Sequence, residues 1–310
     1  MSSQKKLQNS SQAELRLFGY ACGIAGQFSG SKKGPEAVKV ALSHLPRWDM
    51  DFHWADWIED TRSFSDVSAT EVLEIVSRLN DTLARSVAVS EKSSGFPVLI
   101  GGDHSAAVGF WSGVSEASRP SGSTGLIWLD AHMDSHTPET SPNGYVHGMP
   151  LAALLGYGDP RLRSLLSAHP KMSSEHVCLI GTRDFETEER AFLEQRRIRV
   201  FYMSEVKERG LASVVDEAMD IAGSASGGYG VTLDLDALDP QDAPGVSTPS
   251  PGGVRSVHLL PEFYKMLSSP KCVGLEISEF NPGNDVDGRT IDLILNLLKI
   301  TATCRERYCA

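Results

Sequence analysis

Three short clusters of carboxylate and imidazole side chains are the part of this sequence best suited to carry chemistry. They read GGDHS at residues 101–105, DAHMD at 130–134 and DLDALDP at 234–240, and each directly follows a short apolar run. Carboxylates gathered this closely repel one another unless a cation neutralises them. We therefore predict a metal site, with the candidate ligands His104, Asp130, His132, Asp134, Asp234 and Asp236.

The make-up of this ligand set favours two metal ions rather than one. Two imidazoles and four carboxylates are too many for a single tetrahedral zinc ion that keeps an open position. They suit a pair of hard divalent ions that share some of the carboxylates. Mixed oxygen and nitrogen ligands favour manganese over zinc, with nickel or cobalt as alternatives.

The spacing inside the clusters also has a structural meaning. Asp130, His132 and Asp134 are two residues apart, and so are Asp234 and Asp236. In an extended backbone, alternate side chains lie on the same face. Either spacing alone is also typical of a solvated surface turn. Three clusters that each follow an apolar run favour a shared site instead.

The elements that must position these clusters are predicted from apolar runs that alternate with longer amphipathic stretches. Short apolar runs, typical of buried parallel strands, lie at 15–20, 98–100, 125–129, 176–180, 198–202, 229–235 and 273–277. Amphipathic stretches such as 71–90 and 205–221 indicate helices between them. This alternation predicts an α/β fold with a parallel sheet covered on both faces. We expect one domain over residues 14–310 and a disordered tail over residues 1–13.

The ends of the predicted strands are where a ligand is expected. In open α/β sheets, ligands bind at the carboxyl ends of the strands. The three clusters, together with the acidic segment 276–279 that ends a fourth apolar run, should therefore lie along one edge of the sheet.

Composition and charge argue against several other classes of protein. Acidic residues outnumber basic ones by 40 to 29, which gives a formal net charge of −11 and disfavours binding to nucleic acid or anionic lipid. No apolar stretch is long enough to cross a membrane, and the polar N-terminal segment lacks the core of a secretory signal. The five scattered cysteines are typical of reduced thiols, so we expect a cytoplasmic protein. Residues 19–26 lack the Gly-x-Gly-x-x-Gly spacing of a dinucleotide site.

The three clusters, in this order and with these separations, resemble the signature motifs of the ureohydrolase family, which includes arginases and agmatinases. Residues 19–26 and the Gly-Pro-Glu at 34–36 extend the resemblance from Gly19 to about residue 300. The resemblance implies an arginase-like, three-layer α/β/α sandwich with an eight-stranded parallel sheet. It also implies a dimanganese centre that cleaves a guanidino or amidino group, in a homo-oligomer that is a trimer or a hexamer.

The resemblance further assigns roles to individual residues. It gives one ion the ligands His104, Asp130, Asp134 and Asp234, and the other ion Asp130, His132, Asp234 and Asp236, so that Asp130 and Asp234 bridge. Asp134 would also orient the attacking hydroxide. His147 matches the histidine that shuttles a proton to the leaving amine, and Glu279 matches the acid that pairs with the guanidinium. Thr248 matches a threonine that lines the same pocket.

The substrate that the resemblance favours is L-arginine, because the segment 130–148 resembles the arginases most. The residues expected to read the α-amino and α-carboxylate groups are His136, Asn143, Tyr145 and Glu186. His136 and Tyr145 stand where arginases usually carry asparagine, and Glu186 where they carry aspartate. Agmatine or another guanidino compound is the alternative substrate. A catalytically silent metal-binding partner is a remote alternative, since the six candidate ligands, His147 and Glu279 are all present.

Overall fold

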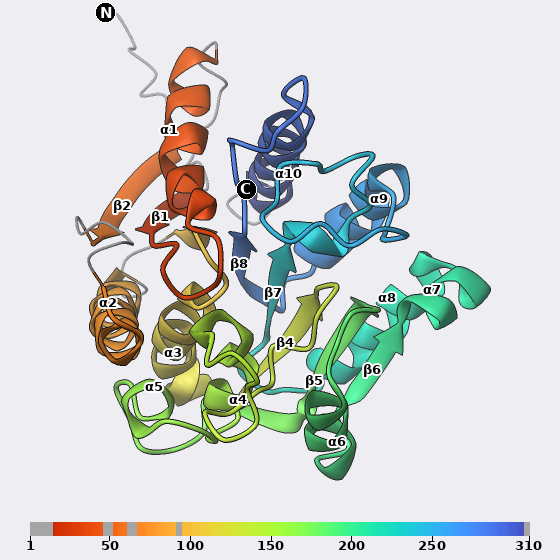
Figure 1. The fold of residues 1–310 in the computed structure, drawn as a ribbon. Helices are drawn as coiled ribbons and strands as arrows, with labels where there is room; N and C mark the ends of the chain where they lie inside the picture. Colours follow the sequence, from red (N-terminus) through yellow and green to blue (C-terminus); the bar gives the residue numbers. More distant parts are fainter. Residues whose placement is uncertain (1–14, 46–51, 61–66, 91–94, 307–310) are drawn as a thin grey trace, which may run out of the picture.

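The protein folds around one parallel sheet, seen in a computed structural model that describes residues 15–45, 52–60, 67–90 and 95–306 (Figure 1). The strands are β1 (Leu15–Ala21), β2 (Phe52–Glu59), β3 (Phe96–Gly101), β4 (Thr124–Leu129), β5 (Met172–Thr182), β6 (Arg199–Tyr202), β7 (Tyr229–Asp234) and β8 (Cys272–Ser278). Their order across the sheet is β2-β1-β3-β8-β7-β4-β5-β6, and every neighbouring pair is parallel. The predicted fold class is confirmed. The tail predicted over residues 1–13 lies outside the described residues.

Helices cover both faces of this sheet, as the alternating pattern predicted (Figure 1). They are α1 (Gly34–His44), α2 (Ala69–Ser90), α3 (Ala106–Ser118), α4 (Pro150–Leu154), α5 (Pro160–Arg163), α6 (Thr187–Gln195), α7 (Met203–Arg209), α8 (Leu211–Ala222), α9 (Ser256–Leu267) and α10 (Arg289–Glu306). One buried apolar cluster joins the sheet to α1 and α7–α10, and a second joins it to α2–α6. Along β4, Ile127 and Leu129 enter the first cluster, whereas Leu126 and Trp128 enter the second. This is the two-residue alternation of a strand that is buried on both faces.

Two elements differ from the sequence prediction. The edge strand β2 was not predicted, because its sequence FHWADWIE has few aliphatic residues and only Ile58 is buried. The helical stretch predicted over 205–221 is two helices, α7 and α8, which are separated at Gly210. Gly210 has a φ of +80°, in the left-handed region that glycine tolerates and that ends a helix.

The strand order explains how distant clusters come together. β3, β8, β7 and β4 are consecutive in the sheet, and the clusters follow their carboxyl ends. The four cysteines within the described ranges, Cys22, Cys178, Cys272 and Cys304, are all buried. Among the described helices, none has the length and apolar character needed to cross a membrane.

Candidate metal centre and active site

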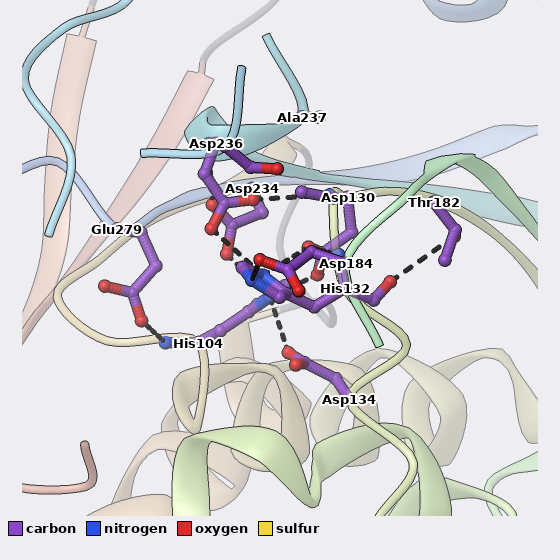
Figure 2. Close-up of polar contacts among 12 residues, drawn as sticks. His104, Asp130, His132, Asp134, Thr182, Asp184, Asp234, Asp236, Ala237 and Glu279 are labelled. Carbon is purple, nitrogen blue, oxygen red and sulfur yellow. Dashed lines mark hydrogen bonds and ion pairs between the residues drawn. The ribbon is translucent and has the colours of Figure 1, made fainter. Parts of the chain in front are cut away.

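The first half of the candidate metal centre is built around His104, which lies in the loop between β3 and α3 (Figure 2). Its Nδ1 atom lies 3.2 Å from Asp130 Oδ2, 3.0 Å from Asp134 Oδ2 and 3.1 Å from Asp234 Oδ2. The imidazole is buried, as are all three carboxylates. The four side chains that the family resemblance assigns to one ion therefore converge on one point.

The second half is built around His132, which follows β4. His132 Nδ1 lies 3.2 Å from Asp236 Oδ2 and 3.4 Å from Asp130 Oδ1. Asp130 thus faces both imidazoles, one with each carboxylate oxygen. Backbone amides fix the carboxylates locally, because the His132 amide donates to Asp130 Oδ1 at 2.7 Å and the Asp236 amide donates to Asp234 Oδ1 at 2.9 Å.

The electrostatics of these residues fit a pair of cations. His104 Nδ1 has no hydrogen-bond partner within the described part of the chain, since none of its three carboxylate contacts has hydrogen-bond geometry. Burial, together with the like charges of Asp236 and Asp130, raises the pKa of Asp234 well above its usual value. Burial and Asp130 also raise the pKa of Asp134, to about 6. An imidazole nitrogen without a hydrogen-bond partner in the described residues and mutually repelling carboxylates, all facing one point, form a donor set that can bind a divalent ion.

A buried chain of hydrogen bonds, which the sequence analysis did not predict, orients His104. His104 Nε2 lies 3.0 Å from Thr232 Oγ1, and the Thr232 hydroxyl donates to Glu276 Oε2 at 2.9 Å. Trp111 Nε1 donates to the same oxygen at 2.6 Å. Burial raises the pKa of Glu276 to about 7. Partners of this kind fix the ring orientation of a ligating histidine and leave its other nitrogen for the metal.

Next to the metal centre, the structure brings His147 and Glu279 together. His147 lies in the short 3-10 helix Val146–Gly148, and its Nδ1 is 3.3 Å from Glu279 Oε1. The same oxygen accepts the His104 backbone amide at 2.9 Å (Figure 2). Burial lowers the pKa of His147, but Glu279, together with Asp134 and Asp103, raises it, to about 9 overall. An imidazole and a carboxylate at this distance can exchange a proton and bind a cationic group.

The backbone itself is strained at two of these positions. Asp134 has a φ of +48° and Glu279 a φ of +66°, both in the left-handed region. For residues other than glycine this region costs about 1–2 kcal/mol. Such strain gathers at functional sites, where the surrounding structure holds a side chain in one direction.

A cavity of about 210 Å³ opens onto the centre, and every residue predicted to contact substrate lines it. His132, Asp134, Asp234, Asp236, His147 and Glu279 line its inner part, and His136, Asn143, Tyr145, Glu186 and Thr248 complete the wall. Asn143 and Glu186 are exposed, whereas the inner carboxylates are buried. Asn143 and Glu186 thus lie nearer to solvent than the carboxylates of the candidate metal centre, whereas His136 is buried.

The wall also contains a residue that the sequence analysis missed. Glu189 is buried, accepts the backbone amides of Ser135 and Glu186, and lies 3.7 Å from His136 Nε2. His136 Nε2 is 3.3 Å from Glu186 Oε2, so His136 faces both carboxylates. Burial and the neighbouring Glu186 raise the pKa of Glu189 to about 8. Little in the sequence indicated this role, because Glu189 lies in a run of charged residues that is typical of the solvent-exposed face of a helix.

Arg183, directly after β5, holds the loop that carries Asp236. Its guanidinium donates to the backbone oxygen of Asp236 at 2.7 Å and to that of Ser250 at 2.6 Å. Its own amide donates to Ala131 O at 2.8 Å. Arg183 therefore ties two loops of the candidate metal centre to a third, which nothing in its local sequence could show.

Comparisons with known proteins agree with this geometry. The sequence model of the Arginase family matches residues 13–303. The arginase of Brevibacillus brevis is 34% identical over 290 residues, which cover 92% of this chain and 96% of the relative. The arginase of Bacillus caldovelox is 39% identical over 229 residues, which cover 73% of this chain and 75% of the relative. The crystal structure of arginase from Bacillus cereus superposes with a TM-score of 0.86 at 32% identity, covering 94% of this chain and 98% of that one. The chain therefore belongs to the arginase family, whose members are metal-dependent ureohydrolases.

Proposed function

We propose that this enzyme hydrolyses L-arginine to L-ornithine and urea. The observation that carries the proposal is one cavity that joins a two-ion donor set at its inner end to a polar head-binding wall at its mouth. Arginase relatives that match most of the chain support it.

The metal centre of this proposal uses the six predicted ligands. His104, Asp130, Asp134 and Asp234 would hold one manganese ion, and Asp130, His132, Asp234 and Asp236 the other, with nickel or cobalt as alternatives. Two divalent cations bound there would polarise the substrate and lower the pKa of water. The side chains around them then have to place the guanidinium and move one proton.

Glu279 and His147 would perform these two tasks. Glu279 is held by the His104 amide and would accept hydrogen bonds from the guanidinium, whose planar fork matches a carboxylate. Asp134 would orient the attacking oxygen by a hydrogen bond. As the C–N bond breaks, the leaving amine needs a proton, and His147 Nδ1, the nitrogen that faces Glu279, would deliver it.

The wall at the mouth would select the amino acid head. Asn143 and Tyr145 would face the α-carboxylate, while Glu186, which contacts His136, would pair with the α-ammonium. We expect Glu186→Ala to lower kcat/KM for L-arginine roughly 10- to 150-fold, since a charged hydrogen bond contributes about 1.5–3 kcal/mol. Most of the change should be in KM, because this contact lies away from the reacting atoms. Glu188→Ala is the matched control, since Glu188 is exposed and does not line the cavity.

The test of substrate is urea release by the manganese-loaded enzyme with L-arginine, agmatine, guanidinobutyrate, guanidinopropionate and guanidine. L-Arginine should have the highest kcat/KM, and agmatine should be poor because it lacks the α-carboxylate. If agmatine or a guanidino acid is preferred, the alternative ureohydrolase function is correct. If no compound turns over although metal is bound, the chain is a silent metal-binding relative.

The remaining features of the proposal concern the whole protein. We propose a single domain over residues 14–310, a homo-oligomer that is a trimer or a hexamer, and a cytoplasmic location. Its partner would be the small guanidino substrate, with no role in binding nucleic acid or membranes. Light scattering of the purified protein tests the oligomer, because a monomer at all working concentrations would contradict it.

A further inference from the structure

The glycine loop after β1 packs directly against the imidazole of His147. A Cβ atom built on Gly26 would lie 2.7 Å from His147 Nε2, 2.8 Å from Cε1 and 3.0 Å from Cδ2. Gly26 is buried, and its φ lies outside the left-handed region that favours glycine. Its backbone conformation therefore suits any residue. What the site requires of Gly26 is the absence of a side chain.

The neighbouring backbone also holds His147. The His147 amide donates to Ala25 O at 3.2 Å, and the Ala25 amide donates to Asp103 Oδ2 at 3.1 Å. The Asp103 carboxylate is buried and accepts the Ser105 amide as well, at 3.2 Å. The loop that contacts His147 is thus anchored to the loop that carries His104.

The opposite edge of the imidazole faces Glu279. His147 Nδ1 lies 3.3 Å from Glu279 Oε1. The His104 backbone amide donates to the same oxygen (Figure 2). The ring is therefore confined between a backbone surface on its Nε2 side and a fixed carboxylate on its Nδ1 side. The His147 side chain is 29% exposed and faces the cavity with its remaining surface. The contacts with Gly26 and Glu279 therefore limit the orientations that the ring can adopt.

We propose that Gly26, with the Ala25 carbonyl and its anchor Asp103, positions His147 for proton transfer. This inference rests on the proposed role of His147 as the proton donor. Gly26 also lines the cavity, but the three nearest atoms to an added methyl group belong to His147, so its effect is assigned to the imidazole. An added methyl group would meet the end of a side chain rather than backbone, so it would displace the ring and leave the fold intact.

The test is the variant Gly26→Ala in the manganese-loaded enzyme. We expect kcat for the preferred guanidino substrate to fall roughly 10²-fold, the effect of displacing a catalytic group by about 1 Å. KM should change little, and the unfolding midpoint and bound metal per chain should match the parent. A crystal structure of the variant should show the imidazole moved from Glu279. An unmoved imidazole with the parent's kcat would overturn the proposal.

A double-mutant cycle separates positioning from a general structural defect. In a His147→Ala background, the three ring atoms that the added methyl group would meet are gone. Gly26→Ala should then cause almost no further loss, so the two effects are strongly non-additive. Equal losses in both backgrounds would mean that Gly26 acts elsewhere, and the proposal would be wrong.

The same cycle distinguishes failure of this inference from failure of the proposed function. If His147→Ala keeps the parent's kcat, His147 is not the proton donor and the proposed mechanism fails. If His147→Ala is slow but Gly26→Ala is not, the mechanism stands and the positioning role of Gly26 is refuted.

Discussion

We expect replacement of Arg183 to destabilise the loop that carries Asp236, without removing any candidate metal ligand. In Arg183→Met the apolar stem of the side chain is kept, while the donors to the backbone oxygens of Asp236 and Ser250 are lost. A hydrogen bond from a charged donor contributes about 1.5–3 kcal/mol. Because Arg183 is only half-buried, water replaces part of what is lost, and we take the lower value for each of the two shortest bonds, about 3 kcal/mol together.

The assay is thermal unfolding of the metal-free protein, followed by manganese binding. With an unfolding entropy of about 2.1 cal/mol/K per residue, each kcal/mol shifts the midpoint of a chain of 310 residues by about 1.5 °C, so the unfolding midpoint should fall by roughly 4–5 °C. Manganese should also bind more weakly, because the loop must be ordered before the Asp236 carboxylate can bind the metal. Arg183→Lys should lie between parent and Arg183→Met, since one ammonium cannot span both loops.

The matched control is Arg85→Met on α2, where the arginine is exposed and pairs with Asp81 on the same helix. This variant should unfold and bind manganese as the parent does. If Arg183→Met behaves like the control in both measurements, Arg183 does not hold the loop and the reasoning is refuted.

Three further predictions concern the ions, the proton and acid stability. Asp234→Ala should lose at least one metal ion per chain and nearly all activity, as elemental analysis and urea release will show, and full activity would exclude a bridging role. His147→Asn should lower kcat roughly 10²–10⁴-fold with unchanged metal content; a parent-like rate without added imidazole would remove His147 from the mechanism. Hydrogen bonding with Arg255 lowers the pKa of Asp242 to about 2, below its ordinary value near 3.8. The carboxylate thus stabilises the fold above pH about 4 and loses this effect as the pH falls toward 2. The stability difference between parent and Asp242→Asn should shrink across that range in acid unfolding, and a constant difference would contradict this.

The candidate metal ligands could be predicted because local sequence places them. Each cluster follows a buried strand directly, and the carboxyl ends of parallel strands meet at one edge of a sheet. The sequence therefore indicated that His104, Asp130 and Asp234 would be neighbours, and the structure brings their side chains within contact of one another.

The residues that support those ligands could not be predicted, because their roles depend on strand order. Thr232 lies inside an apolar run and reads as part of the core, and its contact with Glu276 exists only because β7 and β8 are adjacent. In the sequence Gly26 is one of several glycines in a loop. Its contact with His147, more than a hundred residues later in the chain, is created only by the fold. Burial and long-range pairing, rather than local pattern, decide these contacts.

The number of ions that catalysis needs is the most direct test of the proposed two-metal centre. Manganese titrated into the metal-free protein, with bound ions per chain and urea release from L-arginine measured in the same samples, tests it. We predict that activity rises with the second ion and reaches its maximum at two ions per chain. Full turnover at one ion per chain would contradict the two-metal centre that His104, Asp130, His132, Asp134, Asp234 and Asp236 are proposed to form.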